Sequence, residues 1–345
     1  MPNAIVATNL TKTYDVKVRD PGIKGALAAL VRPRYRQVRA VDSVSFAIER
    51  GDAVAFLGPN GAGKTTTLKM LTGLLFPSAG RAEVAEHDPW TGGNPFRRRI
   101  AFVLGNKQQL LWDLPAEESF RLNRAIYGVS LADYTTRRAE LVELLVLGEL
   151  IDKPVRQLSL GERMKCELAA ALLHQPEVLF LDEPTLGLDL DAQQTIRTFL
   201  GEYRRRHGAT ILLTSHYMAD VTALASRVLI INRGRLLHDG ELSELVTRIA
   251  PIKRIELVLS EPVPRARLEE YGTVAHYAPP RATLEVPRET ATAASTRLLT
   301  DLAVADLSIQ DPPIEEVIRI AFGETEQDAG AEAEAPRADV RRAPP

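Results

Sequence analysis

Residues 58–65 read Gly58-Pro59-Asn60-Gly61-Ala62-Gly63-Lys64-Thr65, which fits the pattern G-x-x-x-x-G-K-[ST] at every fixed position. The apolar residues 53–57 before it predict a short buried strand, and residues 66–71, beginning with Thr66, predict a helix. A turn rich in glycine between a strand and a helix lets backbone N–H groups and the positive helix end approach phosphate oxygens. We therefore expect Lys64 to contact the β- and γ-phosphates of a nucleotide and the Thr65 hydroxyl to ligate Mg²⁺. A chance match is disfavoured because both flanking elements are in place.

The composition restricts the possible classes of protein. A length of 345 residues predicts one large domain plus an accessory piece, and 45% hydrophobic residues suffice for a buried core. The net charge of −2 gives no argument for nucleic-acid binding, and the lone Cys166 excludes a disulfide within the chain, which suits a reducing cytoplasm. The N-terminus lacks the features of a signal peptide, and no apolar run approaches the roughly 18–20 residues of a membrane span. We expect any membrane role to be peripheral.

Hydrophobic patterns divide the remainder of the chain. Residues 5–10 and 41–49 predict strands, and residues 15–39 carry seven Lys and Arg against two Asp. This basic segment is compatible with two interpretations that we weigh equally. It could form a patch that faces anionic lipid headgroups or a membrane partner, or it could be a solvated loop. Apolar residues at helical spacing predict a helical block at about 115–173, after which strands and helices alternate again to about residue 250.

The composition shifts at residue 251. Residues 251–322 predict strands and helices of a small accessory α+β domain, in which we find no chemical motif. Residues 323–345 consist mainly of Ala, Glu, Asp, Arg and Pro with almost no large apolar side chain, and they predict a disordered tail.

Two adjacent carboxylates, Asp182 and Glu183, end an apolar strand about 120 residues after the glycine-rich loop. The first can hold Mg²⁺ through its water shell, and the second can polarise an attacking water. Such a pair is weak evidence alone, because adjacent acids are common in loops. With a phosphate-binding loop upstream, the pair predicts hydrolysis of a nucleoside triphosphate.

The pentapeptide Leu158-Ser159-Leu160-Gly161-Glu162 lies between these two motifs. At this point the sequence resembles the ATP-binding subunits of ABC transporters, whose signature is an LSGGQ-like pentapeptide. Leu160 replaces a glycine and Glu162 replaces the glutamine, whereas Ser159 and Gly161 are kept. We expect Gly161 to begin a helix that offers backbone N–H groups to a phosphate. The resemblance implies that this loop binds the γ-phosphate of ATP held by a second copy.

Further elements resemble the family in the same order. Leu188-Asp189 resembles the loop that follows the catalytic glutamate, and His216 at the end of residues 210–216 resembles the histidine that contacts the γ-phosphate. Tyr14 matches the aromatic residue that stacks on adenine. The family also has a glutamine after the strand at 100–104. Here either Asn106 or Gln109 supplies that amide oxygen to Mg²⁺ and the water, and the sequence leaves both open.

The resemblance covers about residues 4–250 and implies an α/β P-loop NTPase core of the ABC ATPase type. This core has a mixed sheet with an antiparallel part, an inserted helical subdomain and, here, a small C-terminal α+β domain. It further implies an ATPase with ATP and Mg²⁺ as cofactors, in which two copies sandwich the nucleotides. More narrowly, the sequence resembles exporter-type subunits that pair with separate ABC-2-type membrane permeases. Such a homodimer would act peripherally at the cytoplasmic face of the cell membrane.

Two alternative hypotheses about the function remain. A soluble ABC ATPase acting on ribosomes or DNA usually carries two cassettes in one chain or long insertions, which are absent here. We expect no nucleic-acid partner. A silent module that uses ATP only as glue is disfavoured by intact Lys64, Asp182, Glu183 and His216.

Overall fold

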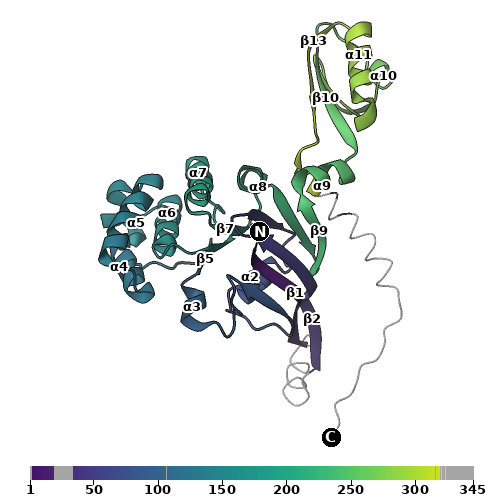
Figure 1. Cartoon of the computed structure of the whole chain (residues 1–345). Helices are drawn as coiled ribbons and strands as arrows, with labels where there is room; N and C mark the ends of the chain where they lie inside the picture. Colours follow the sequence, from purple (N-terminus) through teal and green to yellow (C-terminus); the bar gives the residue numbers. More distant parts are fainter. Residues whose placement is uncertain are drawn as a thin grey trace, which may run out of the picture. The chain divides into compact units, whose positions relative to one another are not determined.

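The computed structural model describes residues 2–18, 34–105 and 107–314, together with residues 316–318, 320 and 323. Residues 19–33 of the basic segment, Asn106 and residues 324–345 of the expected tail lie outside the described residues. The chain forms two compact units, Met1–Gly240 and Glu241–Pro345. They are treated separately below (Figure 1).

A six-stranded sheet forms the centre of the first unit, with the strand order β5-β6-β7-β3-β8-β9. The first five strands in this order pair in parallel. All residues of β3, β6 and β7 are buried, as expected for central parallel strands covered on both faces. The strands are β3 (Ala53–Leu57), β5 (Ile100–Leu104), β6 (Val178–Asp182), β7 (Thr210–Thr214), β8 (Arg227–Asn232) and β9 (Arg235–Glu241).

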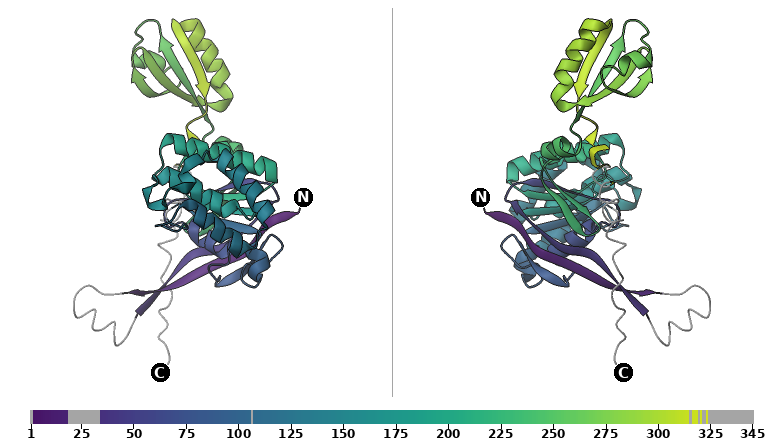
Figure 2. Two further views of the ribbon diagram at one scale, coloured as in Figure 1. Left: turned by 90° about the vertical axis from the view of Figure 1, so that its left-hand side faces the viewer. Right: turned by 90° about the vertical axis from the view of Figure 1, so that its right-hand side faces the viewer.

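A three-stranded antiparallel sheet, β2-β1-β4, packs against this centre through a shared apolar core. It consists of β1 (Asn3–Val18), β2 (Arg34–Glu49) and β4 (Ala79–Val84). Fully buried Ile5 and Ile48 face each other across the first two strands and share the core with Phe56 of β3. The predicted strands at 5–10 and 41–49 were too short, because the ladder continues through largely exposed residues to the pair Val18 and Arg34 (Figure 2). Backbone pairing there needs no apolar alternation.

Helices surround the central sheet and fill the interval between β5 and β6 (Figure 1). The predicted helical block consists of three α-helices joined by two short 3₁₀ helices. Its last helix begins at Leu160 rather than at the predicted Gly161, because Ser159 is the residue that caps it. The helices are α2 (Lys64–Leu71), α3 (Gly93–Arg97), α4 (Ala116–Tyr127), α5 (Leu131–Leu144), η1 (Gly148–Asp152), η2 (Val155–Gln157), α6 (Leu160–Leu172), α7 (Leu190–His207) and α8 (Met218–Leu224).

The second unit is a four-stranded antiparallel sheet of order β11-β12-β10-β13, with α11 packed on one face (Figure 2). Its core includes Ile255, Leu284 and Leu298, which are fully buried. Val317, beyond the last strand, packs with Val246 of α9, so this helix belongs to the second unit. The elements are α9 (Leu242–Ile249), β10 (Ile252–Leu259), α10 (Arg265–Leu268), β11 (Thr273–Ala278), β12 (Arg281–Pro287), η3 (Arg288–Thr290), α11 (Ala291–Asp301) and β13 (Val304–Gln310).

These elements confirm the predicted class, an α/β core with an antiparallel part, inserted helices and a C-terminal α+β unit. Among the helices that the structure describes, every one is too short or too polar to cross a bilayer.

Candidate nucleotide-binding site

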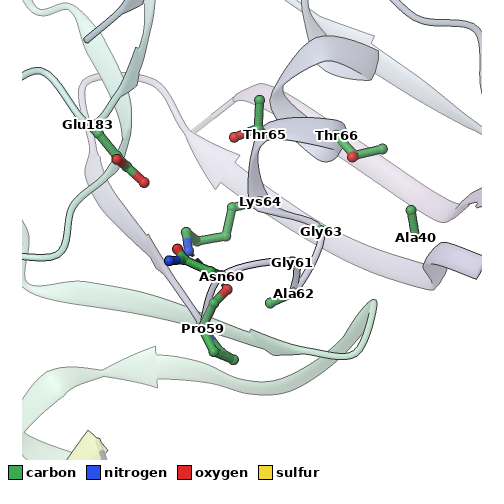
Figure 3. A pocket seen from close by; sticks show the side chains of 10 residues that line it. All are labelled: Ala40, Pro59, Asn60, Gly61, Ala62, Gly63, Lys64, Thr65, Thr66 and Glu183. Carbon is green, nitrogen blue, oxygen red and sulfur yellow. Dashed lines mark hydrogen bonds between the residues drawn. The ribbon is translucent and has the colours of Figure 1, made fainter. Parts of the chain in front are cut away.

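A pocket of about 150 Å³ lies over the loop that joins β3 to α2 (Figure 3). Gly61 and Gly63 adopt φ values of 80° and 108° there, a left-handed conformation that glycine accepts without strain. The loop also passes close to β8, since a Cβ on Gly58 would lie 2.3 Å from the Ile231 carbonyl oxygen. Glycine is therefore required at these positions, and without side chains there the backbone N–H groups of the turn stay accessible to a ligand. The pocket is lined by Ala40, Pro59, Asn60, Gly61, Ala62, Gly63, Lys64, Thr65, Thr66 and Glu183.

Lys64 provides the buried positive charge of this pocket. Its side chain is 6% exposed, and Nζ donates hydrogen bonds to the carbonyl oxygens of Gly58 at 2.5 Å and Pro59 at 3.2 Å. Burial lowers the pKa of Lys64, while the nearby Glu183 and Asp182 act in the opposite direction. An ammonium group removed from water in this way attracts an anion strongly, because little solvent screens it. The position suits contact with phosphate oxygens.

Asp182 joins the end of β6 to the start of α2 through its two carboxylate oxygens. Thr65 Oγ1 donates to Asp182 Oδ2 at 2.9 Å, and Thr214 Oγ1 donates to Asp182 Oδ1 at 2.7 Å. A carboxylate beside a threonine hydroxyl is a hard oxygen donor set of the kind that Mg²⁺ prefers, with water and phosphate oxygens completing its shell. The chemistry of the residues therefore fits the expected ion. Among the described residues no cluster of three His, Cys, Asp or Glu side chains forms an all-protein metal site.

Glu183 and His216 form a polar pair at the edge of the pocket. His216 Nε2 lies 2.9 Å from Glu183 Oε1, and both side chains are partly exposed. Glu183 adopts a φ of 56°, while its N–H donates to the carbonyl oxygen and to Oγ1 of Thr214, both at 3.1 Å. Positive φ in a non-glycine residue is a strain that persists only where the surroundings enforce it. In Figure 3 the carboxylate lies across the pocket from the phosphate-binding loop. A water molecule placed between them could be polarised by this carboxylate.

Tyr14 lies on β1, opposite Val38 of β2, and 39% of it is exposed. Lys12 Nζ lies 5.4 Å from the centre of its ring. Tyr14 is not among the residues that line the pocket, although Ala40 of the adjoining strand is. The ring is accessible for stacking, and its contact with adenine stays a prediction.

The signature residues lie at the N-terminus of α6 and outside the pocket lining. Ser159 Oγ accepts from the N–H of Glu162 at 3.2 Å, and Glu162 Oε2 accepts from the N–H of Ser159 at 2.8 Å. This reciprocal capping box explains how glutamate fits where the family has glutamine, and the backbone hydrogen bond lowers the pKa of Glu162. Leu160 is 38% exposed, whereas a Cβ on Gly161 would lie 2.6 Å from Ala192 Cβ. Gly161 is needed for this close approach of α6 to α7.

The loop after β5 contains the two candidates for the family's glutamine. Gln109 Nε2 donates to the Phe102 carbonyl oxygen at 3.0 Å, so its amide group is held against β5. Asn106 lies outside the described residues. The choice between the two as a ligand of Mg²⁺ stays a prediction.

Glu167 is a residue that the sequence reasoning missed. It lies on α6, is 2% exposed, and accepts a hydrogen bond from the backbone of Gln109. Its Oε2 has no hydrogen-bond partner among the residues that the structure describes, and Arg163 Nε lies 3.9 Å from Oε1. Burial raises the pKa of Glu167 to about 7. The signal was present as a single acid within an apolar stretch of a helix, flanked by Cys166 and Leu168. This carboxyl group connects the signature helix to the loop after β5.

The substitution Glu167→Gln is expected to stabilise the protein increasingly as the pH rises from 5 to 8. The pKa of Glu167 rises from 4.5 to about 7, so between these values the unfolded chain loses the proton that the folded chain keeps. Folding of the wild type weakens over this range by up to about 3 kcal/mol, and glutamine, which resembles the protonated acid, avoids that loss. Urea unfolding at several pH values measures this change in the free energy of unfolding.

Glu162→Gln is the control on the same helix. Because the pKa of Glu162 is lowered, its replacement is expected to destabilise at pH 8. A pH-independent difference for Glu167→Gln contradicts the prediction.

Comparisons with known proteins agree with this geometry. A family model described as "ABC transporter" matches residues 41–186, and one described as "EvrA-like ABC transporter, C-terminal domain" matches residues 251–310. The chain is 37% identical over 232 residues to the "Daunorubicin resistance ATP-binding protein DrrA3" of Streptomyces coeruleorubidus, covering 66% of this chain and 71% of that one. It is 32% identical over 307 residues to the "Daunorubicin/doxorubicin resistance ATP-binding protein DrrA" of Streptomyces peucetius, covering 86% and 92%.

A solved structure shares the fold. The "Structure of ATP binding subunit of ABC transporter" is 27% identical and has a TM-score of 0.59, covering 71% of this chain and 92% of that one.

Proposed function

This chain belongs to the ATP-binding subunits of ABC transporters, and we propose that two copies of it drive export through separate ABC-2-type membrane permeases. The family is one of ATPases, which agrees with a glycine-rich loop that lies near Glu183 and whose Thr65 contacts Asp182. The observation that carries the catalytic part of the proposal is the Glu183–His216 pair, 2.9 Å apart at the pocket edge.

The proposed chemistry assigns one task to each part of the site. The loop amides and Lys64 bind the phosphates of ATP, and Tyr14 stacks on adenine. Thr65 and Asp182, with Asn106 or Gln109, would hold Mg²⁺, which supplies charge neutralisation at the β- and γ-phosphates when bound. Glu183 accepts the proton of the attacking water, and His216 donates a hydrogen bond toward the γ-phosphate.

We propose that the second copy completes the site. The signature residues lie outside the pocket of their own chain, at a helix end that carries partial positive charge. They are Ser159, Leu160, Gly161 and Glu162. Placed over ATP bound by the partner, this end would offer backbone N–H groups to the γ-phosphate. The capping box turns the Glu162 carboxylate toward the Ser159 N–H, which reduces its repulsion of phosphate. Hydrolysis would then remove the nucleotide contact that joins the copies.

Export through a membrane partner is supported by the two daunorubicin-resistance relatives and by an apolar surface patch. We give the name coupling patch to the exposed apolar side chains of two consecutive segments, the loop before α4 and α4 itself, where Leu122 and Ile126 lie one helical turn apart. Clusters of large exposed apolar groups are typical of interaction sites. We propose that permease loops dock there, with the protein held peripherally at the cytoplasmic face of the membrane. The patch comprises Leu111, Trp112, Leu114, Leu122 and Ile126.

The domain division is also proposed here. The sequence predicts a nucleotide-binding cassette at 1–250, with its helical subdomain at about 115–173, and an accessory domain at 251–322. We propose to place their boundary at Gly240 instead, because α9 packs with Val317 of the second unit.

Affinity purification from native membranes tests the proposed partner. We expect a polytopic membrane protein to copurify at near one-to-one stoichiometry, and Trp112→Ala to reduce its recovery several-fold. Trp112 is 44% exposed in the coupling patch, so its truncation removes aromatic contact area without opening a core cavity. Leu299→Ala, at a 56% exposed apolar residue of α11, is the control and should not change recovery. Recovery of ribosomes or DNA-repair proteins without a membrane protein would instead support the soluble alternative.

A further inference from the structure

Asp220 is a buried carboxylate behind the catalytic pair. It lies in the first turn of α8, is 1% exposed, and is absent from the pocket lining. Its Oδ2 accepts hydrogen bonds from Thr185 Oγ1 at 2.5 Å and from Ser215 Oγ at 2.6 Å. Its Oδ1 accepts from Arg197 Nη1 of α7 at 3.0 Å. Three donors from three segments therefore meet on one side chain.

Two of these donors belong to the segments that carry the proposed catalytic pair. Thr185 follows Glu183 by two residues, and Ser215 directly precedes His216. Both hydroxyls bond to the same oxygen of Asp220, so the two segments are held at a fixed separation from each other. The positive φ of Glu183 leaves its segment in a conformation that the chain would not keep unaided.

The chemistry of the network favours a rigid connection. A buried carboxylate is costly unless it is paired, and Arg197, whose side chain is 11% exposed, supplies the opposite charge. Hydrogen bonds from hydroxyls to an ionised carboxylate are shorter and stronger than neutral ones. Because water is excluded from Asp220, solvent does not replace these bonds when one of them is removed.

We propose that Asp220 is a positioning residue that aligns Glu183 and His216 for hydrolysis through Thr185 and Ser215. This inference rests on the catalytic roles proposed above for the pair. Asp220 itself does not reach the nucleotide, so its loss should slow the chemical step and leave ATP affinity nearly unchanged. Replacing a residue that only stabilises the fold would not lower kcat while leaving ATP affinity unchanged.

The first test compares Asp220→Asn with the double variant Thr185→Val/Ser215→Ala, which leaves the buried Asp220–Arg197 ion pair intact. We expect kcat to fall about 10–100-fold in both, with the Kd for ATP within about twofold of wild type. Thr185→Ser keeps the hydroxyl and should retain the wild-type rate. If Asp220→Asn does not fold, the double variant and Thr185→Ser decide the question. An unchanged kcat in the double variant overturns the proposal.

A matched control breaks a similar network away from the pocket. Glu117, 9% exposed, accepts from Tyr134 Oη at 2.8 Å and from Arg138 Nε at 2.7 Å. Glu117→Gln should lower the thermal midpoint and leave kcat within about twofold. An equal loss of kcat in Glu117→Gln would mean that the Asp220 effect reflects general destabilisation, which overturns the proposal.

Combination with the loss of both Glu183 and His216 separates a positioning role of Asp220 from a structural one. If Asp220 acts through the pair, adding Asp220→Asn to the variant Glu183→Gln/His216→Ala, which lacks both proposed catalytic groups, should cost little further activity, because residues that act as a unit are not additive. Multiplied losses in that background overturn the proposal. Wild-type rates in both His216→Ala and Glu183→Gln would reject the proposed roles of the pair. A loss in those variants with none in Asp220→Asn would reject the present inference alone.

Discussion

Replacing Glu183 by Gln is expected to lower the kcat of ATP hydrolysis by about 10²–10⁴-fold, the usual contribution of a general base. Glutamine is isosteric and keeps an oxygen that can face His216 Nε2, now 2.9 Å from Glu183 Oε1. It cannot accept a proton from water at neutral pH. The backbone of residue 183 is fixed by two hydrogen bonds to Thr214, so the substitution should leave the geometry of the site in place.

The same variant should accumulate as an ATP-bound dimer. Nucleotide contacts from both copies persist when hydrolysis is blocked, so the proposed sandwich cannot open. Size-exclusion chromatography with ATP should show the dimer for Glu183→Gln and mainly the monomer for wild type after turnover. Glu177→Gln, at an exposed carboxylate paired with Arg99 near the start of β6, is the control and should retain activity. Unchanged turnover in Glu183→Gln would remove Glu183 from its assigned role.

The phosphate-binding loop and its setting were predictable because every determinant is local. Apolar runs predicted β3 and β6, and the glycine spacing predicted the turn between β3 and Lys64. Asp182 and Glu183 could be placed at a strand end by the same reasoning. Their partners could not, because Thr65 and Asp182 are 117 residues apart and only the parallel order of the sheet brings them together.

Not every feature that was missed in the sequence depends on tertiary contacts. The ladder of β1 and β2 beyond residue 14 was missed because its short apolar alternation, Val16 and Val18, lies within the segment at 15–39 that was interpreted by its basic charge. α6 begins at Leu160, one residue before the predicted Gly161, and the Ser159-x-x-Glu162 spacing that marks its capping box was not used in the prediction. The Asp220 network, by contrast, joins residues from α7, α8 and two loops, and its members look like ordinary polar side chains in the sequence.

Lys64→Met is expected to weaken ATP binding by about 10–100-fold, since hydrogen bonds to a charged group contribute about 1.5–3 kcal/mol. The same substitution should leave the protein without nucleotide nearly as stable as wild type. Lys64 is 6% exposed and its ammonium contacts carbonyl oxygens of the loop, so methionine removes a buried charge while filling similar space. Thermal unfolding with and without ATP measures both effects, because a ligand raises the midpoint only when it binds the folded state.

The pH dependence of unfolding provides an independent check on Lys64. Its lowered pKa means that, between that value and 10.5, the unfolded chain binds the proton that the folded chain releases. Stability of the wild type should therefore gain from Lys64 as the pH rises through this window, and Lys64→Met should lack that gain. Lys69→Met, on the same helix but outside the pocket, is the control and should keep the ATP-induced rise in midpoint. If Lys64→Met also keeps that rise, Lys64 does not bind phosphate. If it unfolds readily without ATP, the buried ammonium instead holds the loop together through its carbonyl contacts.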